Sequence, residues 1–327
     1  MTAIGSTQRL LPGVPLIESP IFEAELEASD LSPAEREVAI ALNRNGYAVL
    51  DFPDPEFDAR AARIIERLGP QFSDSGTSPD GVYRTAGRIQ DAWIIDPDVR
   101  SLAANRELLD LLSRLYGRRA FPFQTLNFDV GTQQALHTDA VHFSSIPQRF
   151  MCGVWVALED VRAEAGPLQY VPGTHRLPIM DNAQIGRHGF GHPLDSAQLP
   201  FQDVWNTLTG LPGMQPEPFL ARKGQALIWC ANLLHGGMPQ LDPALTRWSQ
   251  VTHYYFDDCI YYTPALSDEY LGRLQLRNLV SVEDGSPRPN LYVGEEVQPY
   301  APACQQTKSG GSWLPRWMRK LVREFKS

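Results

Sequence analysis

FPFQTLNF, residues 121–128, is the first of several short segments rich in β-branched and aromatic residues. The later ones are FMCGVWVAL (150–158), LQYV (168–171), QALIWC (225–230) and WSQVTHYYF (248–256). Residues of these types favour β-strands, and turn-forming residues separate the segments. This pattern is typical of an antiparallel sandwich or barrel, so we expect a mainly β fold from residue 121 onwards.

Helical signals dominate the first third of the chain. Ser32, Pro33 and Glu35 have the spacing of a capping box with proline at the first helical position, and the helix can run to Asn45 before Gly46 stops it. Another helix is predicted between the cap residues Asn105 and Gly117. The remaining expectations are a strand at 47–52 and helices at 56–68, 201–209 and 267–278.

These patterns predict three parts. Residues 1–30 form an N-terminal extension, and 31–304 form one domain with a helical N-terminal part and β core. Within it, 178–223 is rich in Gly, Pro, Asn and Gln, and so long a loop is typical of a lid or a binding loop. Residues 305–327 form a linker and a C-terminal helix.

Composition excludes several classes of protein. With 43% hydrophobic and 20% charged residues the chain can bury a core, and its net charge of -9 disfavours nucleic-acid binding. No stretch has the continuous apolar length of a membrane span. The four cysteines are far apart, which predicts reduced thiols and a cytoplasmic protein.

ALHTDAVHF, residues 135–143, contains the candidate metal ligands. His137 and Asp139 are two residues apart, so on an extended backbone their side chains point to the same face. His235 follows an apolar strand and precedes two glycines, where it could supply a third ligand. Two imidazoles and one carboxylate with open positions are the ligand set of non-haem Fe(II) oxygenases. The H-x-D spacing alone is weak support.

The order of motifs strengthens this interpretation. HTD at 137–139 is followed by GPLQYVPGTH at 166–175, then by HGG at 235–237 and by Arg247 twelve residues after His235. Over roughly 47–256 the chain resembles the phytanoyl-CoA dioxygenase family. The resemblance implies a double-stranded β-helix, a cupin-like jelly roll with flanking helices. It also implies an enzyme that uses Fe(II), 2-oxoglutarate and O2.

The resemblance also implies roles for further residues. Arg247 stands where the family places the arginine that binds the far carboxylate of 2-oxoglutarate, and a guanidinium can hold a carboxylate with two hydrogen bonds. Gln124, Asn127 and Trp155 look like further cosubstrate contacts, although sheet packing would explain them nearly as well. Asp139 keeps the carboxylate that related halogenases lack, so we expect hydroxylation with release of succinate and CO2.

The other histidines give weaker signals. His142, His188 and His192 could face a substrate or be solvated, and His253 within a strand is expected to be structural.

Near the C-terminus, 313–326 would form a helix with a Trp-rich apolar face opposite a basic one. It could contact a membrane surface or a partner protein, or pack on its own domain.

The leading hypothesis is an oxygenase acting on an aliphatic carbon of a small molecule, such as a lipid-like compound or a secondary metabolite. One alternative is a non-catalytic jelly roll that binds metal or 2-oxoglutarate and acts through a partner. Another is a protein hydroxylase. The sequence does not identify the substrate or the oligomeric state.

Overall fold

The structure is a computed structural model that describes residues 9–73, 76–77, 80–85, 87–192 and 196–297. The predicted linker and amphipathic helix at 305–327 lie outside the described residues. Within the described N-terminal extension, Leu16, Ile17, Phe22 and Leu26 are buried in the main hydrophobic core. This part of the extension therefore packs on the domain.

An antiparallel sheet of eight strands forms the centre of the fold. Its order is β1-β10-β7-β12-β5-β4-β3-β2. The strands are β1 (Tyr47–Asp51), β10 (Gln225–Cys230), β7 (Met151–Ala157), β12 (Ser249–Phe256), β5 (Ala120–Phe128), β4 (Arg88–Gln90), β3 (Tyr83–Thr85) and β2 (Gly76–Thr77). Four of the predicted segments thus form the neighbouring strands β10, β7, β12 and β5.

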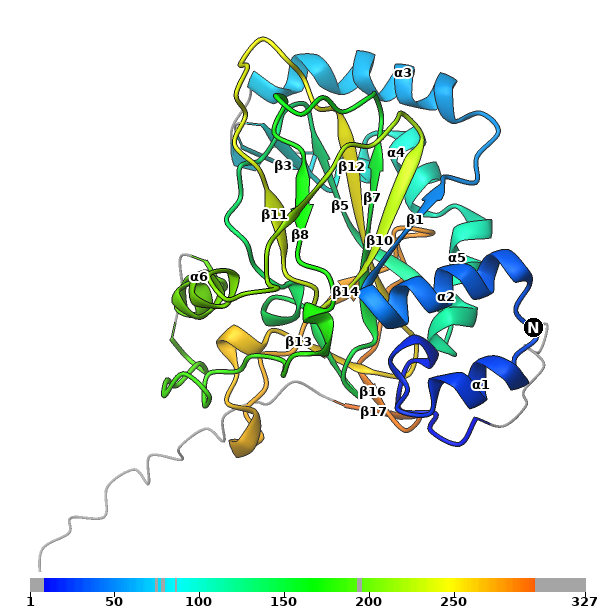
Figure 1. Cartoon of the computed structure of the whole chain (residues 1–327), viewed down its shortest axis with the longest axis vertical. Coiled ribbons are helices and arrows are strands. Elements are labelled where there is room, and N and C mark those ends of the chain that lie inside the picture. Colours follow the sequence, from blue (N-terminus) through cyan, green and yellow to red (C-terminus); the bar gives the residue numbers. More distant parts are fainter. Residues whose placement is uncertain (1–8, 74–75, 78–79, 86, 193–195, 298–327) are drawn as a thin grey trace, which may run out of the picture.

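A second, smaller sheet faces the large one. It pairs β11 (His235–Gly237), β8 (Leu168–Tyr170) and β9 (Glu217–Phe219) in the order β11-β8-β9. In Figure 1, β8 and β11 lie in front of β5, β7 and β12. A cluster that includes Trp155, Leu168 and Phe219 packs between the two sheets. Two facing antiparallel sheets form the expected jelly roll, the double-stranded β-helix.

Shorter strands complete the lower part of the molecule. They form the pairs β13 (Ile260–Tyr262) with β6 (Ser144–Ile146), β14 (Leu279–Val280) with β15 (Pro287–Arg288), and β16 (Leu291–Tyr292) with β17 (Glu295–Glu296).

Helices flank the large sheet. They are α1 (Phe22–Ala28), α2 (Pro33–Asn45), α3 (Phe57–Leu68), α4 (Pro97–Ala103) and α5 (Arg106–Tyr116), with α6 (Gln202–Thr209) on the far side of the jelly roll (Figure 1). The predicted caps are present. Ser32 and Glu35 form the capping box of α2, and Asn105 accepts a hydrogen bond from the Leu108 N–H at the start of α5. Gly46 and Gly117 end these helices in the left-handed conformation.

The predicted helix at 267–278 is wrong. Only Glu269–Leu271 forms a single 3-10 turn there. Gly272 follows with a φ of 65°, and the chain reverses so that Asp268 and Arg273 pair across the turn. A glycine in the left-handed region ends a helical turn, and the chain then pairs with itself instead of continuing.

The long segment 178–223 packs on the domain through two of its aromatic residues. Phe201 and Trp205, at the start of and within α6, are fully buried in a small cluster with Val141 and Leu234. Whether this segment moves as a lid stays a prediction.

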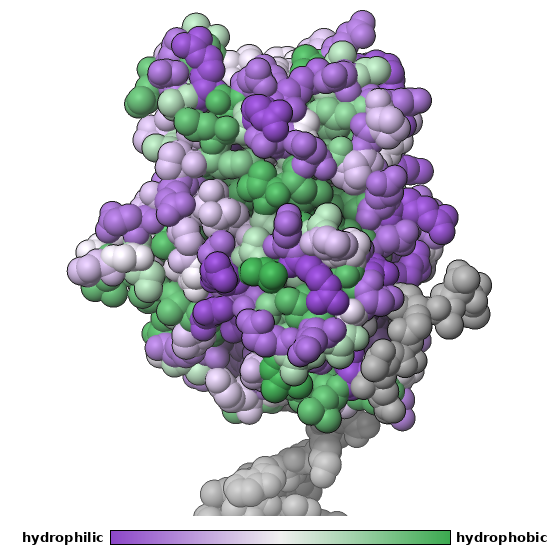
Figure 2. Space-filling view, turned by 45° about the vertical axis from the view of Figure 1, so that its right-hand side comes forward, coloured by the Kyte–Doolittle hydropathy of each residue, from purple (hydrophilic) through white to green (hydrophobic). Residues whose placement is uncertain are grey.

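The surface in Figure 2 mixes hydrophilic side chains with small hydrophobic patches. In the part of the chain that the structure describes, no helix is long and apolar enough to cross a membrane. Cys152, Cys230 and Cys259 are buried and free.

Candidate active site

The backbone brings two candidate ligands together from segments far apart in sequence. His137 and His235 exchange both backbone hydrogen bonds, each with an N to O distance of 2.9 Å. The two glycines after His235 permit this approach. A Cβ on Gly236 would lie 2.7 Å from the Gln134 carbonyl oxygen, and one on Gly237 would lie 2.8 Å from the backbone nitrogen of Gln133. The HGG sequence therefore places the loop before His137 directly against β11.

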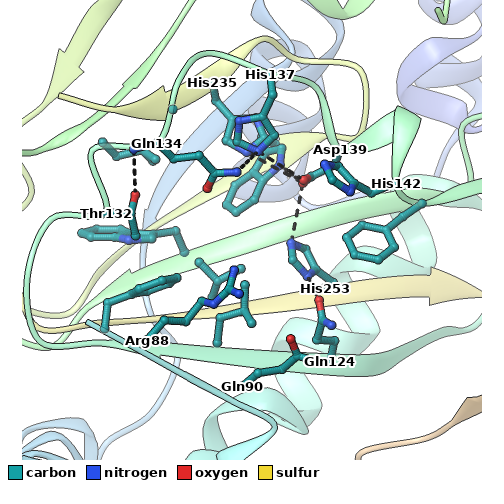
Figure 3. Close-up of a pocket in the computed structure, with 18 of the residues that line it drawn as sticks. Arg88, Gln90, Gln124, Thr132, Gln134, His137, Asp139, His142, His235 and His253 are labelled. Carbon is teal, nitrogen blue, oxygen red and sulfur yellow. Dashed lines mark hydrogen bonds and ion pairs between the residues drawn. The ribbon is translucent and has the colours of Figure 1, made fainter. Parts of the chain in front are cut away.

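His137, Asp139 and His235 converge on one point. One ligand atom from each lies within 4.8 Å of the others, and all three residues are buried. The Nε2 atoms of His137 and His235 are 3.9 Å and 3.8 Å from the carboxylate oxygens of Asp139. Figure 3 shows the two imidazoles side by side next to this carboxylate. The arrangement is a compact pocket of two nitrogens and one carboxylate.

Backbone carbonyls orient both imidazoles. His137 Nδ1 donates to the Ala135 carbonyl and His235 Nδ1 to the Leu233 carbonyl, each at 2.9 Å. Because a carbonyl only accepts, Nδ1 carries a proton in both rings, which leaves Nε2 as the atom that can bind a metal. Both Nε2 atoms lie on the side of Asp139. In the structure His137 Nε2 accepts a hydrogen bond from the Gln134 amide at 3.2 Å, and a bound metal takes the place of this bond.

A tryptophan holds the carboxylate. Trp229 Nε1 donates to Asp139 Oδ2 at 2.8 Å. The indole needs the space beside Gly153, its cross-strand partner on β7, because a Cβ at that position would lie 2.1 Å from the indole ring. Gly153 thus positions Asp139 through Trp229.

The protonation states suit a divalent metal. Burial lowers the pKa of His137 to about 3, and the neighbouring His235 acts in the same direction. Burial opposes ionisation of Asp139, but three surrounding imidazoles and the Trp229 N–H outweigh it and lower the pKa to about 2. His137 is therefore neutral and Asp139 ionised at neutral pH, as metal ligation requires.

The triad lies at one end of a cavity of about 240 Å³ between the two sheets. The large sheet supplies one wall through alternate residues, because successive side chains on a strand point to opposite faces. The wall residues are Arg88, Gln90, Gln124, Leu126, Phe128, Trp155, Trp229, Val251 and His253. Figure 3 shows Gln124, Gln90 and Arg88 on the wall opposite His137 and His235.

Arg247 also lines the cavity. It is 2% exposed, its Nε has no hydrogen-bond partner, and among the described residues no carboxylate pairs with it. Its guanidinium carbon is 5.6 Å from the Trp155 ring and 6.0 Å from the Phe128 ring. Burial lowers the pKa of Arg247 to about 10, so it still carries its charge at neutral pH. A buried, unpaired guanidinium is costly unless an anion binds it.

Of the three other predicted cosubstrate contacts, two line the cavity and one does not. Gln124 and Trp155 line the cavity, and the Nε1 of Trp155 has no partner. Asn127 does not line it. It is three residues after Gln124, so the alternation of the strand turns it to the opposite face, where its Nδ2 donates to Gln250 Oε1 at 3.3 Å. The expectation that Asn127 faces the cosubstrate is corrected accordingly.

The other histidines divide in the same way. His142 and His253 line the cavity, whereas His188 and His192 are exposed. His253, for which a structural role is expected, has its Nε2 3.6 Å from Asp139 Oδ2, and its Nδ1 donates to Gln124 Oε1 at 2.9 Å.

Sequence reasoning missed several lining residues, among them Arg88, Gln90, Gln134 and Trp229. The alternation within β10 could have indicated Trp229. The two-residue spacing of Arg88 and Gln90 is too short a pattern to indicate a strand.

The donor set fits both an iron ion and 2-oxoglutarate. Two imidazoles and a carboxylate suit Fe(II) with open positions, and the unpaired guanidinium of Arg247 suits the far carboxylate of the cosubstrate.

Solved structures with the same fold include several 2-oxoglutarate enzymes. The carbocyclase SnoK from nogalamycin biosynthesis has a TM-score of 0.55 at 21% identity, over 79% of this chain and 93% of that one. The epimerase SnoN, in complex with Fe3+, alpha ketoglutarate and nogalamycin RO, has a TM-score of 0.52 at 21% identity, over 82% and 96%. EctD from S. alaskensis, with 2-oxoglutarate and 5-hydroxyectoine, has a TM-score of 0.53 at 20% identity, over 72% and 79%.

No curated protein sequence matches the chain significantly. Residues 42–244, more than half of the chain, match the family Phytanoyl-CoA dioxygenase (PhyH). This match covers the HTD motif, the HGG motif and most of the jelly roll. The chain therefore belongs to the phytanoyl-CoA dioxygenase family of Fe(II)/2-oxoglutarate-dependent oxygenases, which use O2.

Proposed function

We propose that the protein hydroxylates an aliphatic carbon of a small molecule and releases succinate and CO2. His137, Asp139 and His235 bind Fe(II), and Arg247 binds the far carboxylate of 2-oxoglutarate. The observation that carries this proposal is the buried guanidinium of Arg247, which lines the same cavity as the triad and has no anionic partner among the described residues.

When bound, Fe(II) and 2-oxoglutarate supply the activation of O2. The chain supplies position and shielding. The Ala135 and Leu233 carbonyls fix the two imidazoles, and Trp229 fixes Asp139, so the three ligands are preorganised. Trp155 and Phe128 flank Arg247 and keep water from its ion pair, which strengthens the hold on the cosubstrate.

The long segment is proposed to cover this site. Gln198 accepts a hydrogen bond from Gln134 Nε2 at 3.0 Å, and Gln202 donates to the Leu136 carbonyl at 3.1 Å. Both contacts join 178–223 to the loop just before His137. A segment held by two amide hydrogen bonds at the cavity rim could close over a bound substrate.

A small-molecule substrate is supported by the cavity of about 240 Å³ and by the structures of like fold that hold nogalamycin RO and 5-hydroxyectoine. We also propose a cytoplasmic location, which the buried free cysteines support. Contact of 313–326 with a membrane or partner stays a prediction.

The test is turnover under 18O2 with candidate small molecules, with succinate and product analysed by mass spectrometry. Hydroxylation places one labelled oxygen in succinate and the other in the product hydroxyl. Asp139→Ala should abolish both, whereas His188→Ala, at an exposed histidine, should leave both unchanged. Succinate with an unlabelled product would contradict hydroxylation. An iron-loaded protein that forms no succinate with any candidate would favour the non-catalytic alternative.

A further inference from the structure

A second arginine lines the cavity and has no assigned role. Arg88 lies on β4, which pairs with β5 in the large sheet. Its neighbour Ile89 is fully buried in the core on the other face of the sheet. Because side chains alternate along a strand, Arg88 and Gln90 both point into the cavity, as Figure 3 shows.

No described residue compensates the charge of Arg88. Among the described residues it makes no hydrogen bond and no ion pair, and its Nε is shielded from solvent. The side chain as a whole is only partly buried, so its terminal nitrogens can be reached from the cavity. An arginine shielded on one side and open on the other is ready to bind an anion.

Counting charges shows which anion is missing. Among the described residues that line the cavity, Asp139 is the one carboxylate. In the proposed complex, the two positive charges of Fe(II) and the charge of Arg247 balance Asp139 and the two carboxylates of 2-oxoglutarate. The charge of Arg88 is then left over, and an unpaired charge in a largely buried site is unfavourable.

Resting on the proposed function, we propose that Arg88 binds an anionic group of the substrate, which is therefore a small organic anion. Arg247 already binds the far carboxylate of 2-oxoglutarate, and the other end of that molecule binds iron. Beside Arg88, the Gln90 amide offers further hydrogen bonds, and Leu126 offers an apolar surface. These neighbours suit a carboxylate joined to a hydrocarbon part.

The test is calorimetric titration of the anaerobic protein loaded with Fe(II) and saturating 2-oxoglutarate. The probes are hexanoate and phenylacetate, each with its neutral amide. At least one carboxylate should bind the wild type more tightly than its amide. Arg88→Gln should weaken it at least about tenfold, since charge-assisted hydrogen bonds are lost. Arg88→Lys should restore part of the affinity, and Arg106→Gln, on the exposed face of α5, should have no effect.

The affinity for 2-oxoglutarate shows whether Arg88 binds the substrate anion or the cosubstrate. It should change less than about threefold in Arg88→Gln and fall at least about tenfold in Arg247→Gln. If Arg88→Gln weakens 2-oxoglutarate as much as Arg247→Gln does, Arg88 belongs to the cosubstrate and the proposal is wrong. It is also wrong if neither carboxylate binds the wild type, or if the amides bind equally well. A wild type that does not bind 2-oxoglutarate would instead contradict the proposed function.

Discussion

Replacing Arg247 by methionine should stabilise the protein without its ligands and abolish its response to 2-oxoglutarate. Burial lowers the pKa of Arg247 from 12.5 to about 10. One pKa unit corresponds to roughly 1.4 kcal/mol, so keeping this charge in the folded state costs about 3 kcal/mol at neutral pH. Attraction to the Trp155 and Phe128 rings returns about 1 kcal/mol.

Methionine fills a similar volume without a charge, so the free energy of unfolding of Arg247→Met should rise by about 1–3 kcal/mol. Urea denaturation without ligand measures this. Added 2-oxoglutarate should stabilise the metal-loaded wild type by mass action and leave the variant unchanged. Arg106→Met is the matched control, because its parent side chain is 92% exposed. A variant less stable than the wild type, or one that 2-oxoglutarate stabilises equally, would refute the reasoning.

Three further changes have defined outcomes. Gly153→Ala should displace Trp229, which lowers the affinity for Fe(II) and changes the tryptophan fluorescence. If neither the affinity nor the fluorescence changed, the role assigned to Gly153 would be contradicted. Asp98→Asn should cost about 1–2 kcal/mol in urea denaturation at pH 7, because three α3 arginines bind this carboxylate, though all are partly exposed. Hydrogen bonds from arginines, that of Arg63 being the largest influence, hold the pKa of Asp98 below its usual 3.8. The carboxylate therefore stabilises the fold above pH 3.8, and this stabilisation is lost as the pH falls further. If wild type and variant differed in stability by the same amount at pH 7 and at pH 2, this reasoning would be contradicted. Ser32→Ala removes the α2 capping box and should cost about 1 kcal/mol by thermal denaturation, whereas no shift would show that the cap adds nothing.

Local signals in the sequence were sufficient where a short-range interaction decides the structure. The capping box at Ser32, the Asn105 cap and the Gly117 stop all depend on residues within one turn, and all are present. The helix predicted at 267–278 failed because Gly272 adopts a left-handed conformation and because residues 275–277 form backbone hydrogen bonds with residues 261–263. Helical periodicity cannot reveal such pairing with a separate segment.

At the site, the sequence identified the triad and Arg247 through motif order. It did not decide whether Asn127 or Gln124 faces the cavity, although strict alternation along β5 puts them on opposite faces. Arg88 and Gln90 reach the cavity only through the pairing of β4 with β5, and Gln134 only through the loop before His137. Those positions depend on tertiary packing, which no local pattern records.

Anaerobic titration with Fe(II) and 2-oxoglutarate tests the central claim most directly, because the iron chelate of this cosubstrate has a weak visible charge-transfer band. Wild type should develop the band, and His188→Ala, at an exposed histidine, should match it. His137→Ala, Asp139→Ala and His235→Ala should lose or strongly weaken it. No band in a well-folded, iron-loaded wild type would contradict the proposed site, as would variants of the three residues that keep the band at full strength.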